Sequence, residues 1–195
     1  MNDFSYLFHP QNYNPLNDAN FYYVSADEIV DGIWLGNYAA SQDENFIRSK
    51  QIGVIINCSK HIPFLKTVDT LKYNLFVDDP GSEADHFESN IQVMKKHLGR
   101  LTRNIHHWRN KGLNVLVHCH AGMQRSAGLV LAYLMRYHYV PKSREKEHVE
   151  ESYNKSKKHI LDIRDIAFNR GTSVNFKTAI LHFGPLIPGK DINAP

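Results

Sequence analysis

Residues 115–126 read Val115-Leu116-Val117-His118-Cys119-His120-Ala121-Gly122-Met123-Gln124-Arg125-Ser126, and the rest of the chain is organised around them. Their apolar, β-branched beginning is typical of a buried strand that ends at Cys119. From Ala127 to Val140, apolar residues recur at helical spacing and predict a helix with one buried face. The stretch therefore predicts a strand, a loop and the N-terminus of a helix.

The loop has the residues that a phosphate site requires. Backbone N–H groups ahead of a helix N-terminus can form a concave nest for an anion, and the helix dipole adds positive potential. Gly122 permits the tight turn, and the planar guanidinium of Arg125 can hold two oxygens of a phosphate-like dianion. We expect the same field to lower the pKa of Cys119, which makes its thiolate a nucleophile for phosphorus. Ser126 can hydrogen-bond the sulfur and help it leave in a second step.

His118, Cys119, Arg125 and Ser126 match the motif H-C-x5-R-[S/T], and here the chain resembles the Cys-dependent protein phosphatases. A lone cysteine is more simply interpreted as a buried structural residue. That interpretation would require the strand, the histidine, the glycine, the arginine spacing and the helix to coincide, so we favour the catalytic one. The resemblance implies catalytic roles for Cys119 and Arg125. It implies phosphate binding by His120, Ala121, Gly122, Met123, Gln124 and Arg125.

Alternating strands and helices are predicted along the chain. The expected strands are a hairpin over 28–36 with a turn at Asp31-Gly32, then 54–57 and 73–77. The expected helices are a short one opened by a capping box at 41–44, a long one from about 85, and three over 143–158, 162–168 and 174–183. This alternation predicts an α/β fold with a central, mainly parallel sheet flanked by helices on both faces.

The segment Trp34–Asn37, followed by a helix and by Ile52–Asn57, resembles the opening of the dual-specificity branch of the same phosphatases. The expected fold is therefore protein tyrosine phosphatase-like, with the last helix packed beside the loop. The loop from Ala121 to Ala127 departs from the commoner family pattern at Gln124, where a small polar residue is usual. It is most similar to phosphatases encoded by large DNA viruses.

Three segments are expected: an N-terminal extension over 1–24, a catalytic domain over 25–184 and a flexible tail over 185–195. The extension is rich in aromatic residues, and the sequence leaves open whether it packs on its own domain or against a second copy in a homodimer. A chain of 195 residues with net charge +3 from 23 basic and 20 acidic residues is too balanced to indicate a nucleic-acid partner.

No apolar run approaches the length of a membrane span, and the beginning of the chain lacks the regions of a signal peptide, so we expect no membrane association. Two cysteines, one an expected thiolate, favour a reducing, cytoplasmic compartment. For a viral protein this would be the host cytoplasm or the virion.

Asp78 and Asp79 follow the predicted strand 73–77 and precede the turn Pro80-Gly81. The simplest interpretation of this pair is an exposed turn, but in the resembled family the loop at this strand end supplies the general acid. Side chains alternate along a strand, and the apolar phase through Leu75 and Val77 continues to Asp79. We therefore expect Asp79 to be the general acid. The alternative is Asp78, which a turn that breaks the phase one residue early would favour.

The resemblance implies a dual-specificity protein phosphatase that acts on phosphotyrosine and phosphoserine/threonine in protein substrates, without a metal or cofactor. Two alternatives stay open: a phosphatase for RNA 5′ ends or phosphoinositides on the same fold, and a non-catalytic phosphate-binding module. Positions 120–124 contain no Lys or Arg, and no basic stripe is evident, which disfavours the first. Both Cys119 and Arg125 are present, which disfavours the second.

Cys58 follows the predicted strand 54–57, whose carboxyl end should lie near the loop in a parallel sheet. Buried thiols are common, so a structural role is the favoured interpretation. The alternative is a redox role, in which Cys58 traps oxidised Cys119 as a disulfide.

Overall fold

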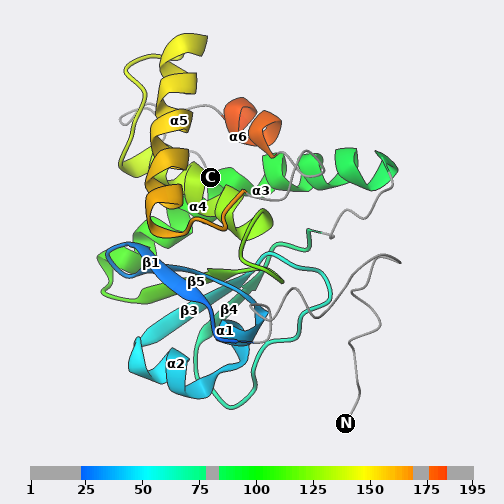
Figure 1. Cartoon of the computed structure of the whole chain (residues 1–195), viewed down its shortest axis with the longest axis vertical. Helices are drawn as coiled ribbons and strands as arrows, with labels where there is room; N and C mark the ends of the chain where they lie inside the picture. The colour runs from blue at the N-terminus through cyan, green and yellow to red at the C-terminus, as the bar shows by residue number, and fades with distance from the viewer. Residues whose placement is uncertain (1–22, 78–83, 169–175, 184–195) are drawn as a thin grey trace.

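A computed structural model describes residues 23–77, 84–168 and 176–183 (Figure 1). Its elements, in chain order, are β1 (Ala26–Val30), β2 (Ile33–Gly36), α1 (Tyr38–Gln42), α2 (Glu44–Ser49), β3 (Ile52–Asn57), β4 (Leu71–Asn74), α3 (Ala84–Asn110), β5 (Asn114–His118), α4 (Arg125–Tyr137), α5 (Lys146–Ile163) and α6 (Lys177–Phe183). Most of the predicted extension and the predicted tail lie outside the described residues.

The predicted nucleophile strand, β5, is the middle strand of a sheet with the order β1-β2-β5-β3-β4. It pairs in parallel with both of its neighbours, β2 and β3, and β3 pairs in parallel with β4. Only the β1–β2 hairpin is antiparallel among the described strands. The predicted mainly parallel sheet is therefore confirmed. It brings the carboxyl ends of β2, β5 and β3 to one edge, where ligands bind in such sheets.

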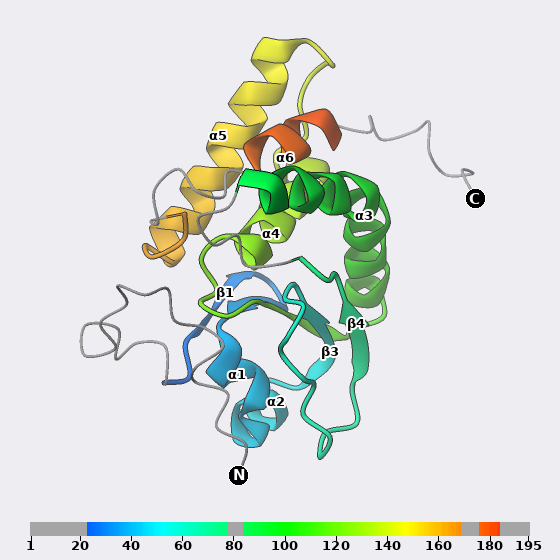
Figure 2. The same cartoon turned by 90° about the vertical axis from the view of Figure 1, so that its right-hand side faces the viewer.

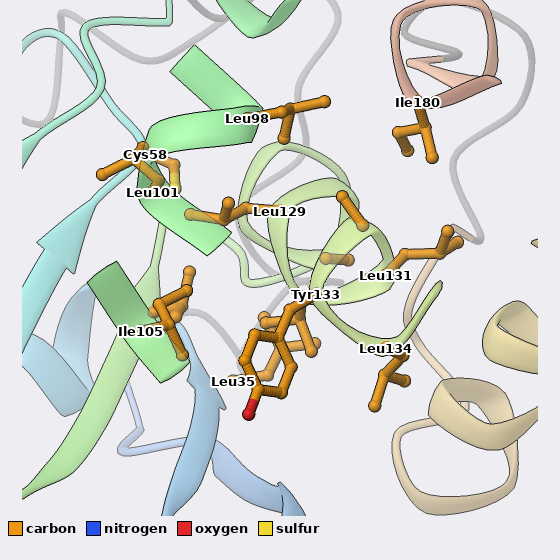
Figure 3. Packing of buried hydrophobic residues seen from close by; sticks show 14 of the residues in the cluster. Leu35, Cys58, Leu98, Leu101, Ile105, Leu129, Leu131, Tyr133, Leu134 and Ile180 are labelled. Atoms are coloured by element: carbon orange, nitrogen blue, oxygen red, sulfur yellow. The ribbon is translucent and has the colours of Figure 1, made fainter. Parts of the chain in front are cut away.

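Helices cover both faces of this sheet, as predicted. Figures 1 and 2 show α3, α4, α5 and α6 on one face and the short helices α1 and α2 on the other. The central helix is α4, which is buried from Arg125 to Arg136. Figure 3 shows Leu129 of α4 pointing toward Leu101 and Cys58, while Leu131 projects from the opposite side of the helix. Because α4 is surrounded, its N-terminus is held rigidly against the end of β5.

The long helix predicted from about residue 85 is present as α3, and it has one apolar face. Its buried apolar residues, each at most 5% exposed, are Ile91, Met94, Leu98, Leu101, Ile105 and Trp108. They follow one another at steps of three and four residues, which places them on one side of the helix. Truncating one such leucine to alanine typically costs about 2–5 kcal/mol of stability, so this face contributes strongly to the core. None of the helices within the described ranges combines the length and apolar character that a membrane crossing requires.

The predicted capping box at Ser41 is wrong. The side chain of Asn37 accepts a hydrogen bond from the N–H of Ala40 at 2.9 Å and starts α1 four residues earlier. Asp43, which accepts from the N–H of Phe46 at 2.8 Å, is the residue that caps α2. Ser41 instead lies inside α1, where its hydroxyl donates to the carbonyl of Tyr38 at 2.7 Å. Asn37 and Asp43 both have the short polar side chains that are typical of helix caps, and each stands directly before the helix that it starts.

Two further predicted boundaries are wrong. The strand predicted over 73–77 ends at Asn74, because Phe76 has φ +51°, which extended backbone cannot adopt. The helix predicted over 143–158 continues to Ile163, and the separate helix predicted over 162–168 is a turn. Arg164 leaves helical conformation with φ −129° and ψ 86°. The chain after it lies beside the loop that follows β5, where the N–H of Phe168 donates to the carbonyl of Met123.

Candidate active site

Cys119 lies between the end of β5 and the N-terminus of α4, where the sequence predicts the nucleophile. Its side chain is only 2% exposed. The hydroxyl of Ser126, in the first turn of α4, donates a hydrogen bond to its sulfur at 3.1 Å. The predicted contact between Ser126 and the sulfur is therefore confirmed.

The pKa of Cys119 is lowered below the ordinary value of a thiol. Burial by itself raises this pKa, because it disfavours the charged thiolate. The positive charge of Arg125 and the hydrogen bonds from the Ser126 hydroxyl and from the N–H groups of Ser126 and Gly122 outweigh burial. The structure thus confirms the predicted direction and shows that the thiolate is stabilised by specific donors around it.

The loop carbonyls are held from outside. The carbonyl of His120 accepts from the N–H of Tyr38 and that of Met123 from the N–H of Phe168, both at 2.8 Å. The guanidinium of Arg164 donates to the two carbonyls between them. In a planar trans peptide, the C=O of one residue and the N–H of the next point in opposite directions. The N–H groups of residues 121–124 are therefore directed toward the interior of the loop, as a phosphate nest requires.

Gly122 makes this loop shape possible. Its φ of +69° lies in the left-handed region that glycine adopts without strain. A Cβ at this position would lie 2.6 Å from the carbonyl oxygen of Gly36 and 2.8 Å from a guanidinium nitrogen of Arg164. The end of β2 and the side chain of Arg164 both occupy the space that a Cβ would need, so only a hydrogen atom fits here.

Arg125 is 5% exposed and points back toward the carboxyl edge of the sheet. Its Nη1 donates to the hydroxyl of Ser59 at 3.1 Å and to the carbonyl of Val77 at 3.4 Å. The N–H of Ser59 in turn donates to the side chain of Asn57 at 2.8 Å. Sequence reasoning missed Ser59. The available signal was a polar residue two positions after β3, the parallel neighbour of β5.

His118 is buried at the end of β5, and burial lowers its pKa to about 4. A ring nitrogen lies 3.4 Å from the carbonyl oxygen of Cys119. The imidazole is therefore neutral at physiological pH, and the charge that faces the thiolate comes from Arg125.

Asp78 and Asp79, the candidates for the general acid, lie outside the described residues. The preceding residues confirm the predicted phase: Leu75 and Val77 are buried, whereas Phe76 is 61% exposed. The choice between Asp78 and Asp79 stays a prediction, because the left-handed conformation of Phe76 interrupts the strand geometry on which the phase depends.

Four residues around the loop were not predicted: Asp27, Asn37, Tyr38 and Arg164. Asn37 connects β2 to α1, and Tyr38 is the first residue of α1. The rings of Tyr38 and His120 are stacked with centroids 6.4 Å apart. Arg164 is distant from the loop in sequence, so the motif alone carried no signal for it. Within the described ranges, no three His, Cys, Asp or Glu side chains gather closely enough to hold a metal ion.

The fold and the site together define the class of Cys-dependent phosphatases predicted from the motif. Residues 33–164 match the family model of the dual specificity phosphatase catalytic domain, and the chain belongs to this family. It is 33% identical over 147 residues to dual specificity protein phosphatase 26 of Homo sapiens, covering 75% of this chain and 63% of the relative. It is 32% identical over 109 residues to the putative tyrosine phosphatase 123R of Invertebrate iridescent virus 6, covering 56% and 66%.

The fold is also similar to the crystal structure of human DUSP28, with a TM-score of 0.62 and 19% identity, covering 81% of this chain and 91% of that chain. At this identity the likeness concerns the fold alone. The chain spans less than two thirds of the length of curated relatives that it matches, such as 20% of the tyrosine-protein phosphatase MSG5 of Saccharomyces cerevisiae.

Proposed function

We propose that this chain is a dual-specificity protein phosphatase that hydrolyses phosphotyrosine and phosphoserine/threonine through a phosphocysteine intermediate. The observation that carries the proposal is a single arrangement. The Cys119 thiol has a lowered pKa, lies at the centre of a loop whose N–H groups point inward, and is faced by the buried Arg125. This arrangement combines a nucleophile with donors for the charge that develops on a phosphoryl group.

In the first step, the Cys119 thiolate attacks phosphorus, a sulfur–phosphorus bond forms, and the bond to the substrate oxygen breaks. Asp79 gives its proton to that leaving oxygen, while Arg125 and the loop N–H groups hold the three equatorial oxygens. In the second step, Asp79 takes a proton from water, and the water oxygen attacks phosphorus. The sulfur leaves as a thiolate, which Ser126 stabilises, and inorganic phosphate is released.

The substrate class rests on the family and on the loop composition. Curated relatives named dual specificity protein phosphatases support protein substrates of both kinds. Positions 120–124 contain no lysine or arginine that would favour a more highly charged polyphosphorylated ligand. We therefore propose phosphorylated proteins as the partners of this site.

The test is hydrolysis of a small aryl phosphate and of matched phosphotyrosine and phosphothreonine peptides, with and without a metal chelator. We expect turnover of all three, unaffected by the chelator. Cys119→Ser should abolish it, and Arg125→Lys should lower kcat/KM by about 10²–10³-fold, because a lysine cannot reproduce the planar two-oxygen contact.

Cys58→Ser is the matched control, because it removes the other thiol and leaves the proposed nucleophile in place. Binding of phosphate without turnover by the wild-type protein would instead support the non-catalytic module. Activity on phosphotyrosine peptides with none on phosphothreonine peptides would refute dual specificity.

A further inference from the structure

Arg164 lies directly after α5, and its side chain is 2% exposed. Its Nε donates to the carbonyl of Gly122 at 3.0 Å and its Nη2 to the carbonyl of Ala121 at 3.3 Å. Nη1 points the other way, donating to the Ser25 hydroxyl at 3.1 Å and forming an ion pair with Asp27 at 2.5 Å. One planar group therefore joins the phosphate loop to the beginning of the sheet.

The contact with Ala121 acts on a single peptide unit. The C=O of this unit belongs to Ala121 and accepts from Arg164, and its N–H belongs to Gly122 and donates to the sulfur of Cys119. The two groups point in opposite directions because the peptide is planar and trans. Rotation of this unit away from Arg164 would therefore turn the N–H away from the sulfur.

Arginine suits this position because of its geometry. The fork of the guanidinium reaches two successive carbonyls and a carboxylate at the same time, whereas a lysine ammonium is a compact point charge on a flexible chain. Asp27 compensates the charge of Arg164, so the effect on the loop is one of orientation. The carbonyl oxygen of Gly36 also approaches Gly122 closely, 2.6 Å from where a Cβ would stand, which restricts movement of this residue further.

We propose that Arg164 is a positioning residue, oriented by Asp27, which holds the Ala121–Gly122 peptide so that its N–H faces Cys119. The consequence for the proposed phosphatase is that the reactivity of the nucleophile depends on a residue outside the signature motif. This inference rests on the proposed function only in taking Cys119 as the nucleophile.

The test measures the rate at which iodoacetamide alkylates Cys119 across a pH series, with the modified residue identified by mass spectrometry. For Arg164→Lys we expect the midpoint of this profile to move to higher pH. We expect kcat on an aryl phosphate to fall by about 10²-fold or more, the loss typical of one misplaced oxyanion donor. Asp27→Asn should shift the midpoint in the same direction by a smaller amount, because Arg164 keeps its loop contacts.

Arg109 offers a matched control at the other end of β5. It also joins a carbonyl, a side chain and a carboxylate, those of Leu113, Asn114 and Asp31. Arg109→Lys should lower the melting temperature and leave the alkylation midpoint of Cys119 unchanged.

A folded Arg164→Lys protein with the wild-type midpoint and wild-type kcat would overturn the proposal. If Arg164→Lys does not fold, Asp27→Asn decides in its place, and a wild-type midpoint there overturns the proposal as well. The absence of turnover by the wild-type protein would refute the proposed function alone, since the alkylation profile does not require turnover.

Discussion

The hydroxyl of Ser126 donates a hydrogen bond to the sulfur of Cys119 at 3.1 Å, across the junction between β5 and α4. Both side chains are buried, at 0% and 2% exposure, so water does not compete for this contact. A hydrogen bond to a charged partner in such surroundings contributes about 1.5–3 kcal/mol. The contact therefore has the strength to influence the step in which the sulfur becomes a thiolate again.

Ser126→Ala should slow hydrolysis of the phosphocysteine intermediate by about 10–100-fold, the rate equivalent of one lost charge-assisted hydrogen bond. Formation of the intermediate should be affected less, so the phosphorylated enzyme should accumulate during turnover of an aryl phosphate. Rapid-quench measurements with mass analysis of the peptide containing Cys119 would detect it. Ser126→Thr, which retains a hydroxyl, is the control. Equal intermediate levels in Ser126→Ala and wild type would contradict the assigned role.

Asp79→Asn should lower the rate by about 10²–10⁴-fold for phosphoserine substrates, because loss of general acid catalysis acts on poor leaving groups. An activated aryl phosphate, whose leaving oxygen needs little protonation, should be affected less. Steady-state rates on both substrates for Asp79→Asn and for the matched Asp78→Asn would separate the candidates. We expect Asp78→Asn to stay near wild type. A larger loss of rate in Asp78→Asn than in Asp79→Asn would show that Phe76, with φ +51°, interrupts the alternation of side chains before the two aspartates.

Protein stability should depend on the titration of His118 below neutral pH. Burial lowers its folded-state pKa from 6.5 to about 4, so between these values the unfolded state binds more protons than the folded state. Stability contributed by this residue is thus fully present above pH 6.5 and lost as the pH falls toward 4. The full loss amounts to about 3 kcal/mol.

Urea unfolding at several pH values would test this dependence. His118→Gln should show a smaller fall in unfolding free energy with acid than wild type, whereas the exposed His107→Gln should fall like wild type. If the unfolding free energy of all three proteins fell equally with acid, the titration of His118 would not be the cause of the loss.

The redox alternative for Cys58 predicts that mild peroxide joins Cys58 and Cys119 in a disulfide. Asn57 and His118 are partners in the β3–β5 register, and their successors are the two cysteines. Strands lie about 4.8 Å apart, which is within the Cα separation that a disulfide spans. Peroxide would convert the Cys119 thiolate to a sulfenic acid, and the Cys58 thiol would displace water from it to form the sulfur–sulfur bond.

Burial, together with the charge of Cys119, raises the pKa of Cys58 well above its ordinary value, so Cys58 itself should resist direct oxidation. Peptide mapping after peroxide should find the 58–119 crosslink, and a reductant should restore activity. Cys58→Ser should instead lose activity irreversibly. Irreversible oxidation of Cys119 in the wild-type protein, without the crosslink, would end the redox interpretation.

The pattern of neighbouring residues was sufficient to predict much of the structure of this protein. The β-branched run before Cys119, the spacing to Arg125 and the apolar stripe of α3 each follow from neighbouring residues, so their structures could be predicted. Boundaries were predicted less well. Several polar residues near one another, such as Asn37, Ser41 and Asp43, can each cap a helix, and only packing selects among them.

By itself, the sequence determined the place of the candidate nucleophile Cys119, of the arginine and of the glycine in the loop, and the parallel sheet that presents them. Only the tertiary structure decided what holds the loop in shape. Ser59 reaches Arg125 across 66 positions of sequence, and Arg164 reaches Gly122 across 42. Such contacts have no periodicity or motif, because they depend on how β3 and the end of α5 are placed beside β5. The chemistry of the site is therefore local in sequence, whereas the orientation of its donors is a property of the folded chain.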